Sequence, residues 1–479
     1  MVLTIVGCTA CYPPLPGAGG AAPSAPTPAT AWQAPQSQTD RAAESRLPPD
    51  TLPPELAGRR DTLQITELVT LALDRSPETR ATWLAARAAA ATYGSDRAVI
   101  FPTITGAIDL TKIKTSATGG RVSVNQVTYG PSLSLSWLLF SFGEAGAFSA
   151  ARNALYSANW SHNAAIADVV QRTIQGYFDY VGAEGLLGAE RATFDQAQAN
   201  LSAADDRRSV GVATIADVLQ ARTAVAQARL AVQSAEGALA SAHGALATLI
   251  GLPPTATFDV DTIEAEAPVA NVAASVDTLI QFALRDRPDL AAERALADQR
   301  RAEASASRAQ FLPSLSATGT TANTFVTNLT GARFSYNVGL ALSIPIFNGL
   351  GWQYAAEAAQ LTAEAETARL RTLEQQVALQ VYQTYQSFRT ATAQVTAAND
   401  LFTSASANAD AARARYREGV GSVLELLTAE QALASARSQQ IQARVTWHTS
   451  LVQLAHDAGL LQPSGATQLP LATTPAGSP

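Results

Sequence analysis

The chain repeats one sequence pattern in its two halves, and this repeat restricts the possible folds more than any other feature. Gly211–Leu219 resembles Gly419–Leu427, which lies 208 residues further along the chain. Ala72–Pro77 and Ala283–Pro288 form a second similar pair, and both end in proline. A nearly constant spacing indicates that the two halves share one order of helices and strands. We therefore expect two structurally equivalent repeats.

The ends of the chain differ in composition from the repeats. Residues 12–58 and 463–479 are rich in proline, alanine, serine and glycine and show no apolar period, which is typical of flexible linkers. We expect four segments in order: a lipobox-like start with a proline-rich tether (1–60), the first repeat (61–259), the second repeat (260–462) and a flexible tail (463–479).

Each half contains a very long stretch without proline. Gly143–Arg208 covers 66 residues and Leu350–Arg417 covers 68, so a helix of either length would extend about 100 Å at ~1.5 Å per residue. Apolar residues in the second stretch recur at intervals of three and four, as in the seam of a coiled coil. They are Leu370, Leu373, Val377, Val381, Tyr385 and Phe388. We therefore predict one very long helix in each half.

Two shorter helices are expected beside each long one. Their ranges are 77–100 and 215–250 in the first half, and 288–311 and 422–458 in the second. In the first of them, Ser76 can act as the N-cap and Pro77 can occupy the first helical position. In both halves the two short helices together nearly match the length of the long one. This match predicts that they lie end to end beside it.

The sequence changes to a period of two between the expected helices. Apolar residues alternate with small polar ones from Val127 to Leu139 and again from Phe334 to Ile344. Weaker partner strands are expected at 104–110 and 315–319. This alternation fits a tilted strand that crosses a bilayer beside a water-filled lumen. Taken alone, the strands fit a half-buried sheet of a soluble protein equally well.

Four such strands cannot close a barrel within one chain. An open edge is excluded from lipid because its N–H and C=O groups find no partner there, and closed barrels start at about eight strands. If the strands lie in a membrane, at least two copies of the chain must therefore combine them. The sequence has no apolar run of about 18 residues or more, so we expect no helical membrane span.

Charge and cysteine content restrict the partners. The net charge is −7, which argues against a nucleic-acid partner because phosphate binding needs clustered Lys and Arg. The two cysteines, Cys8 and Cys11, both lie near the N-terminus. Residues 5–8 resemble a bacterial lipobox, although the basic residues that normally precede one are missing. Cys8 is therefore a candidate for lipidation, and a free thiol in a flexible tail is the alternative.

The segment Arg415–Leu433 resembles the periplasmic tip of TolC-like outer-membrane efflux proteins, and Pro345–Gly349 resembles a strand exit of that family. The resemblance covers about residues 61–462. It implies a mainly α fold with a β-barrel portion: a long antiparallel helical barrel plus four transmembrane strands per protomer, closing as a 12-stranded barrel in a homotrimer. The implied function is a passive exit duct of a tripartite efflux or secretion system. The implied partners are a periplasmic adaptor protein, an inner-membrane pump and the lipid of the bacterial outer membrane, from which the duct would extend into the periplasm.

The resemblance also implies roles for residues near the tip. Asp217 and Tyr416 match a pair, the iris latch, that holds the family's pore closed through a hydrogen bond between neighbouring helices. Glu425 and Thr428 match two positions of the pore constriction, of which only Glu425 keeps a charge that would favour cations. An arginine that assists the latch falls at Gly421, where this chain departs from the family. The alternatives are capping or seam contacts for the latch pair and a solvated helix face for Glu425.

Two tight turns are expected to join the antiparallel helices at this tip. Gly211 and Gly419 lie in them, where a positive φ is often needed. By resemblance, the residues that contact the adaptor are Val210, Gly211 and Val212 in the first turn, and Gly419, Val420 and Gly421 in the second. Turn geometry alone would also explain the glycines.

The sequence contains no phosphate loop, nucleophile elbow or pair of catalytic carboxylates. The four histidines, His162, His243, His448 and His456, lack the spacing of metal ligands. We therefore expect no enzymatic activity, no cofactor and no metal. The main rival is a soluble periplasmic coiled-coil protein, such as the adaptor or a structural scaffold. A cell-surface adhesin is a third alternative, which the repeat of helix, strand and helix disfavours.

Overall fold

The computed structural model describes residues 62–115, 124–261, 275–327 and 331–461. The expected segments 1–60 and 463–479, with Cys8, lie outside this part of the chain. The described elements are α3 (Ile65–Arg75), α4 (Pro77–Arg97), η1 (Ala98–Ile100), β1 (Thr103–Thr115), β2 (Val124–Ser141), α5 (Phe142–Ser209), α6 (Ile215–Leu249), α7 (Val276–Asp286), α8 (Pro288–Ala309), β3 (Ser314–Val326), β4 (Arg333–Ser343), α9 (Gly351–Arg417) and α10 (Val423–Asp457).

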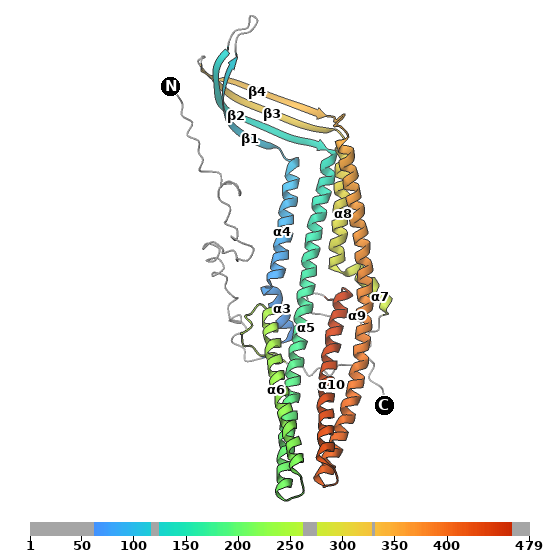
Figure 1. The fold of residues 1–479 in the computed structure, drawn as a ribbon. Coiled ribbons are helices and arrows are strands. Elements are labelled where there is room, and N and C mark those ends of the chain that lie inside the picture. Colours follow the sequence, from blue (N-terminus) through green and yellow to red (C-terminus); the bar gives the residue numbers. More distant parts are fainter. Residues whose placement is uncertain (1–61, 116–123, 262–274, 328–330, 462–479) are drawn as a thin grey trace, which may run out of the picture. The chain divides into compact units, whose positions relative to one another are not determined.

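The order of elements in the first half recurs in the second (Figure 1). The order α3, α4, β1, β2, α5, α6 is matched by α7, α8, β3, β4, α9, α10. The sequence analysis missed α3 and α7, because it began the helices at Pro77 and Pro288. Each proline indeed starts a helix, but the extended residue before it, Ser76 or Arg287, only separates that helix from another of 11 residues. The expected order of elements therefore lacked one helix in each half.

The cap predicted at Ser76 is confirmed. Its Oγ accepts a hydrogen bond from the N–H of Thr79 at 3.3 Å, with proline at the start of α4. The helix ends at Arg97 and continues as a single 3₁₀ turn, so the prediction that it reaches Ile100 as α-helix was too long by that turn. Tightening of the last turn is common at helix ends.

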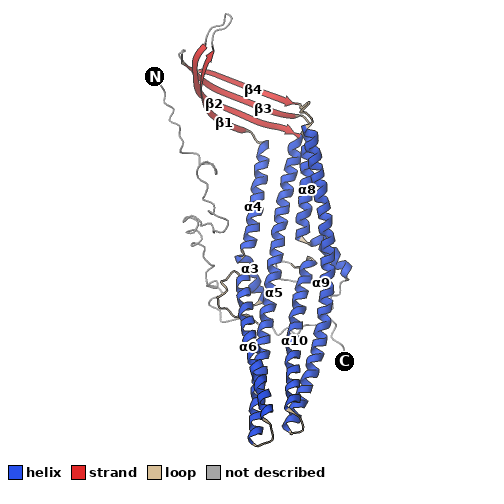
Figure 2. Ribbon diagram, viewed as in Figure 1, coloured by secondary structure: helices blue, strands red, loops and turns tan. Residues whose placement is uncertain are grey.

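The two long helices run beside shorter ones, as expected. α5 has 68 residues and α9 has 67. α4 and α6 pack along α5, α8 and α10 pack along α9, and α5 also contacts α8 and α10 of the second repeat (Figure 2). Among the described residues, no helix has both the length and the apolar character required to cross a membrane.

α5 approaches the second repeat closely at two glycines. A Cβ on Gly146 would lie 2.8 Å from the backbone of Ala306 in α8, and one on Gly182 would lie 2.4 Å from the side chain of Val445 in α10. A side chain at Gly146 would require the backbone of α8 to shift, and one at Gly182 would require the Val445 side chain to move. The contact between the repeats therefore depends on small residues along α5.

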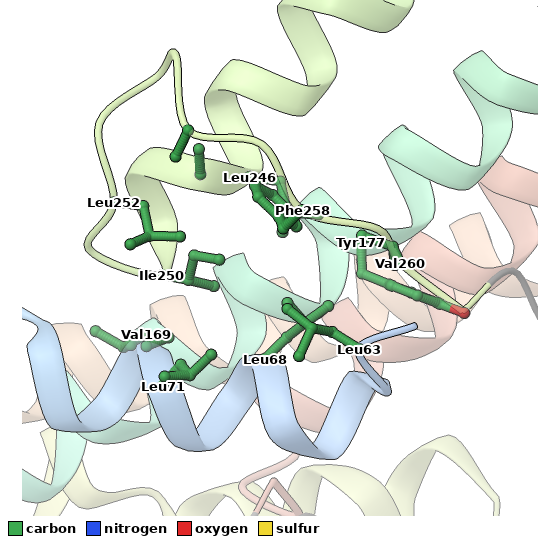
Figure 3. Close-up of a cluster of buried hydrophobic side chains, with 13 residues drawn as sticks. Leu63, Leu68, Leu71, Val169, Tyr177, Leu246, Ile250, Leu252, Phe258 and Val260 are labelled. Atoms are coloured by element: carbon green, nitrogen blue, oxygen red, sulfur yellow. The ribbon is translucent and has the colours of Figure 1, made fainter. Parts of the chain in front are cut away.

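Each repeat has a similar apolar core midway along its long helix. In the first, Leu63, Leu68 and Tyr177 pack with the end of α6 and with residues 256–260 (Figure 3). In the second, α7 and α8 pack on α9 and α10. All six predicted seam residues of α9 lie in this second core or against it, so the coiled-coil seam is confirmed.

The four strands form one antiparallel sheet with the order β1-β2-β3-β4. β1 and β4 are its edges. The apolar residues that alternate along β4, from Phe334 to Leu342, are all more than half exposed, as are Ile104, Ile108 and Leu110 of β1. In the described part of one chain, the sheet thus exposes apolar side chains and has two edges without a partner strand.

Candidate functional site at the helical tips

Two tight turns lie at the ends of the long helices that point away from the sheet (Figure 1). Gly211 has φ +80° and Gly419 has φ +77°, which confirms the predicted positive φ. In each turn the N–H of the residue after the glycine donates to the carbonyl of an arginine, Arg207 at 2.9 Å or Arg415 at 3.0 Å. This Schellman-type arrangement satisfies carbonyls at the helix end.

The tip turns, residues 210–212 and 419–421, present apolar side chains to solvent. Val210, Val212 and Val420 are 73%, 66% and 71% exposed. Gly421 has a different structural role from Gly419: a Cβ there would lie 3.1 Å from both Arg415 Cβ and the Tyr416 backbone nitrogen. The six residues expected to contact an adaptor thus lie in two turns at the end of the helices opposite the sheet.

Asp217 caps its own helix. Its Oδ2 accepts hydrogen bonds from the N–H and the hydroxyl of Thr214, at 2.8 and 2.9 Å, and the hydroxyl of Thr214 accepts from the N–H of Asp217 at 3.2 Å. These reciprocal bonds form a capping box. Among the hydrogen bonds of the described residues, none joins Asp217 to Tyr416. Within one chain, the contacts of Asp217 are those of a helix cap.

Tyr416 is buried at the end of α9. Its hydroxyl is shielded from solvent and has no hydrogen-bond partner among the described residues. The guanidinium of Arg207, at the end of α5, lies over the ring with its carbon 4.4 Å from the ring centre, and its Nη1 donates to the Tyr416 carbonyl. The ring face and the carbonyl of Tyr416 therefore bind the guanidinium of Arg207, which belongs to the α5/α6 hairpin.

The two constriction candidates lie at the start of α10. Glu425 Oε1 pairs with Arg415 Nη1 at 2.6 Å, and both side chains are partly exposed. The hydroxyl of Thr428 donates to the carbonyl of Leu424 at 2.7 Å, and Thr428 faces a groove that also involves Gln220 of α6. The charge of Glu425 therefore has a counter-ion in its own hairpin.

Sequence reasoning missed both arginines of the tip. Arg207 and Arg415 are 208 residues apart, which is the spacing of the repeat. Applying that spacing to charged residues beside the turns would have singled them out. Their partners, however, could not be read from the repeat, since one arginine pairs within its hairpin and the other does not.

A second polar cluster joins the repeats midway along the helices. His456 Nε2 lies 2.8 Å from Asp168 Oδ1 of α5, and His456 Nδ1 lies 3.1 Å from Asp457 Oδ1. Asp457 is fully buried and also accepts from Gln380 and Gln453. Burial alone would lower the pKa of His456, but the hydrogen bonds to Asp168 and Asp457 raise it to about 9.

The other histidines have ordinary packing contacts. His162 Nδ1 lies 3.0 Å from the hydroxyl of Thr82, while His243 stacks on Phe258 and His448 on Phe178. In the part of the chain that the structure describes, no three His, Cys, Asp or Glu side chains gather as they would around a metal ion.

The sequence profile of the outer membrane efflux protein family matches residues 68–252 and 279–460. Protein CyaE of Bordetella pertussis is 28% identical to the chain over 416 residues, which are 85% of this chain and 86% of the relative. The alkaline protease secretion protein AprF of Pseudomonas aeruginosa is 30% identical over 187 residues, 38% of each chain. The crystal structure of the Campylobacter jejuni CmeC outer membrane channel shares the fold, with a TM-score of 0.72 at 19% identity, over 88% of this chain and 96% of that one. Because the profile matches most of both repeats, the chain belongs to the outer membrane efflux protein family.

Proposed function

We propose that three copies of this chain assemble into a closed duct, with the sheets forming a 12-stranded barrel and the helices extending into the periplasm. The family membership makes the chain an outer-membrane exit duct of an efflux or secretion system. The number of copies and the partners are the parts of this function that we infer. The observation that carries the inference is the pair of open sheet edges.

The sheet supports assembly because, among the described residues, no strand pairs with the outer side of β1 or β4. An unpaired edge cannot face lipid, since its backbone groups would lose their hydrogen bonds to water. Pairing β1 of one copy with β4 of the next removes every edge. Three copies of four strands give a number within the range of closed barrels.

The helices support the same assembly. α5 is flanked by shorter helices of both repeats, whereas α9 contacts α7, α8 and α10 of its own repeat. The other side of α9 carries Tyr354, Leu361 and Leu379, all more than half exposed. From repeat symmetry we infer that α4 and α6 of a neighbouring copy pack against this side of α9.

Mass measurement of the detergent-extracted protein tests the proposal directly. We expect a complex of three chains, and Leu379→Glu should reduce its yield because it buries a charge in the seam between copies. Leu379→Met is the matched control and should assemble as the parent does. A water-soluble monomer would instead favour the coiled-coil adaptor or scaffold, and a stable dimer would contradict the proposed number.

At the tip, we propose that residues 210–212 and 419–421 contact a periplasmic adaptor that connects the duct to an inner-membrane pump. The exposed valines of these turns offer a small apolar contact surface. Val212→Asp with Val420→Asp should abolish co-purification of the adaptor while leaving the trimer intact. If the adaptor still co-purifies, the contact lies elsewhere on the duct.

We also propose that the iris latch and the constriction act at this tip. Bonding between Asp217 and Tyr416 of neighbouring helices requires the Tyr416 hydroxyl to turn out of its buried position. Asp217→Ala with Tyr416→Phe should raise single-channel conductance in planar bilayers if that latch forms. Glu425, with Thr428 beside it, would set the preference for cations at the constriction. Unchanged conductance in the double variant would rule the latch out.

The proposed anchor is a lipid on Cys8, outside the described residues. Cys8→Ser in the full precursor should abolish acyl labelling and leave assembly unchanged, because the strands supply the membrane contact. Labelling that persists in this variant would place the lipid on another residue.

A further inference from the structure

One side-chain contact joins the two hairpins of a single copy at the tip. Arg207 belongs to the α5/α6 hairpin, and Tyr416 belongs to the α9/α10 hairpin. The guanidinium of Arg207 covers the ring of Tyr416 and donates to the Tyr416 carbonyl. It also lies 3.3 Å from the position that a Cβ on Gly419 would occupy. Arg207 thus contacts the C-terminal end of α9 at the ring and at the carbonyl of Tyr416.

The surroundings make this contact important for the spacing of the hairpins. Further from the tip, α5, α6 and α10 line a groove of about 910 Å³ that contains polar side chains such as Asn200, Gln227 and Gln431. The polar part of this groove contributes little apolar packing between the hairpins. Contacts at the end itself therefore add to the packing of α10 on α5 and α6 in setting the position of one tip turn relative to the other.

Position 421 is tightly packed in this chain. A Cβ on Gly421 would lie 3.1 Å from Arg415 Cβ and from the Tyr416 nitrogen, so a side chain there would require these atoms to shift by a few tenths of an ångström. Arg207 approaches the same Tyr416 from the other hairpin and supplies a guanidinium without that shift. The guanidinium that contacts Tyr416 is therefore supplied by Arg207, at the end of α5.

We propose that Arg207 is a positioning residue that holds the two hairpins of one copy together at the tip, through the ring face and carbonyl of Tyr416. This inference deepens the proposed duct function and rests on it, since the tip is where the pore would narrow. It assigns no role to the Tyr416 hydroxyl. Removal of the hydroxyl and removal of the ring must therefore have different effects.

Distances between spin labels within one copy test the assignment. Labels at Val212→Cys and Val420→Cys, in a chain with Cys8→Ser and Cys11→Ser, report the separation of the turns. The labelled chain is co-expressed at low ratio with unlabelled chains and measured in detergent. Arg207→Gln and Tyr416→Leu should each lower the ratio of the population at the parent distance to the population at other distances about fivefold, as expected for the loss of a cation–π contact.

Three matched variants make the result specific. Tyr416→Phe keeps the ring face and should retain the parent distance, as should Arg208→Gln, which removes a neighbouring exposed charge. Arg207→Gln combined with Tyr416→Leu should displace the turns no more than either change alone, because both remove one contact.

The inference is overturned if Arg207→Gln retains the parent distance, or if Tyr416→Phe displaces the turns as much as Tyr416→Leu does. If Arg207→Gln fails to assemble, Tyr416→Leu tests the same contact from the other hairpin. The measurement is independent of the proposed assembly, because it reports a distance within one copy. A parent protein that is not a trimer would contradict the proposed duct and leave the assignment of Arg207 to be decided by these distances.

Discussion

The two tips of one copy use equivalent residues in different ways. Arg207 and Arg415 occupy the same position in the two repeats, as do Asp217 and Glu425. In the second repeat the arginine pairs with the acid of its own hairpin, whereas in the first the acid closes a capping box and the arginine reaches Tyr416. Both repeats therefore keep the turn, but their charged residues make different contacts. Arg415 and Glu425 form an ion pair within one hairpin, whereas Arg207 links the two hairpins.

The middle of the helices shows a similar divergence. Asp457 is fully buried at the end of α10, and the position 208 residues earlier holds Leu249. Likewise His456 corresponds to Thr248. The first repeat packs its helices there with apolar side chains, whereas the second places a hydrogen-bonded acid beneath a histidine that reaches Asp168 of the first repeat. The first repeat thus has a mainly apolar core at this level, and the second adds a polar link between the repeats.

The largest predicted effect compares Asp457 with its counterpart. Asp457→Ala should lower the free energy of unfolding by about 3–5 kcal/mol, because it leaves His456 without a buried counter-charge and Gln380 without an acceptor. Leu249→Ala should cost about 2 kcal/mol, since that side chain is only partly buried. Denaturant unfolding of the detergent-solubilised protein measures both. If Asp457→Ala lost no more unfolding free energy than Leu249→Ala, the polar link would contribute no more stability than the apolar side chain at the equivalent position.

The next prediction concerns pH. The pKa of His456 is raised from 6.5 to about 9, against the effect of burial, by its hydrogen bonds to Asp168 and Asp457. A raised pKa stabilises the fold fully below 6.5, and this stabilisation is lost as the pH rises through 9. The loss should be about 3 kcal/mol. Arg287 and Asp289 also lie near this cluster. Against the effect of burial, hydrogen bonds from Arg287 keep the pKa of Asp289 below its ordinary value, so Asp289 does not titrate in this range.

Unfolding measured between pH 6 and 10 checks this prediction. The parent should lose stability across the window, whereas His456→Gln should show a flat profile there. Thr248→His, at the equivalent position of the first repeat, should not create the dependence, because Leu249 follows it and no buried acid of the described residues lies in this repeat. A parent profile as flat as that of His456→Gln would contradict the raised pKa.

A smaller effect is expected at the contact between the repeats. Gly146→Ala should cost about 1–3 kcal/mol, because the added Cβ would lie 2.8 Å from the backbone of Ala306. Gly188→Ala is the matched control in the same helix, where no atom lies within 4 Å, and it should stabilise by about 0.5–1 kcal/mol. The opposite signs separate close packing from helix propensity. The equivalent position in the second repeat, 208 residues later, is Tyr354 of α9, and its side chain is exposed. Within one copy, only the first repeat therefore makes this tight contact.

Periodicity was sufficient to predict the long helices, the four strands and their duplication. Intervals of three and four along α9 identified residues that do pack in its core, and the glycines identified turns with positive φ. The family match decides for the exit duct over the soluble rival. The sequence did not reveal α3 and α7, because a single extended residue separates each from the helix that follows.

The side-chain partners at the tip could not be predicted for a different reason. Arg207 and Tyr416 are 209 residues apart in the chain, so no local pattern relates them. Asp217 and Glu425 occupy equivalent positions, yet the shorter side chain closes a capping box while the longer one reaches Arg415. Such choices depend on side-chain length and on which hairpin lies beside which, and both are settled only in the folded chain.

The smallest predicted effect separates the two charges of the second tip. Arg415 and Glu425 neutralise each other, and both are partly exposed, so the pair should contribute little to stability. If the pair faces the pore, Arg415→Gln leaves unpaired carboxylates and should increase cation preference, whereas Glu425→Gln leaves guanidinium groups and should decrease it. The permeability ratio should change by up to about fivefold in either direction.

Reversal potentials in planar bilayers under a salt gradient measure this permeability ratio, with Arg417→Gln as a control for loss of an exposed arginine nearby. Shifts of the same sign in both variants would show that the pair does not face the pore, and the constriction would then have to be sought at other residues of α10.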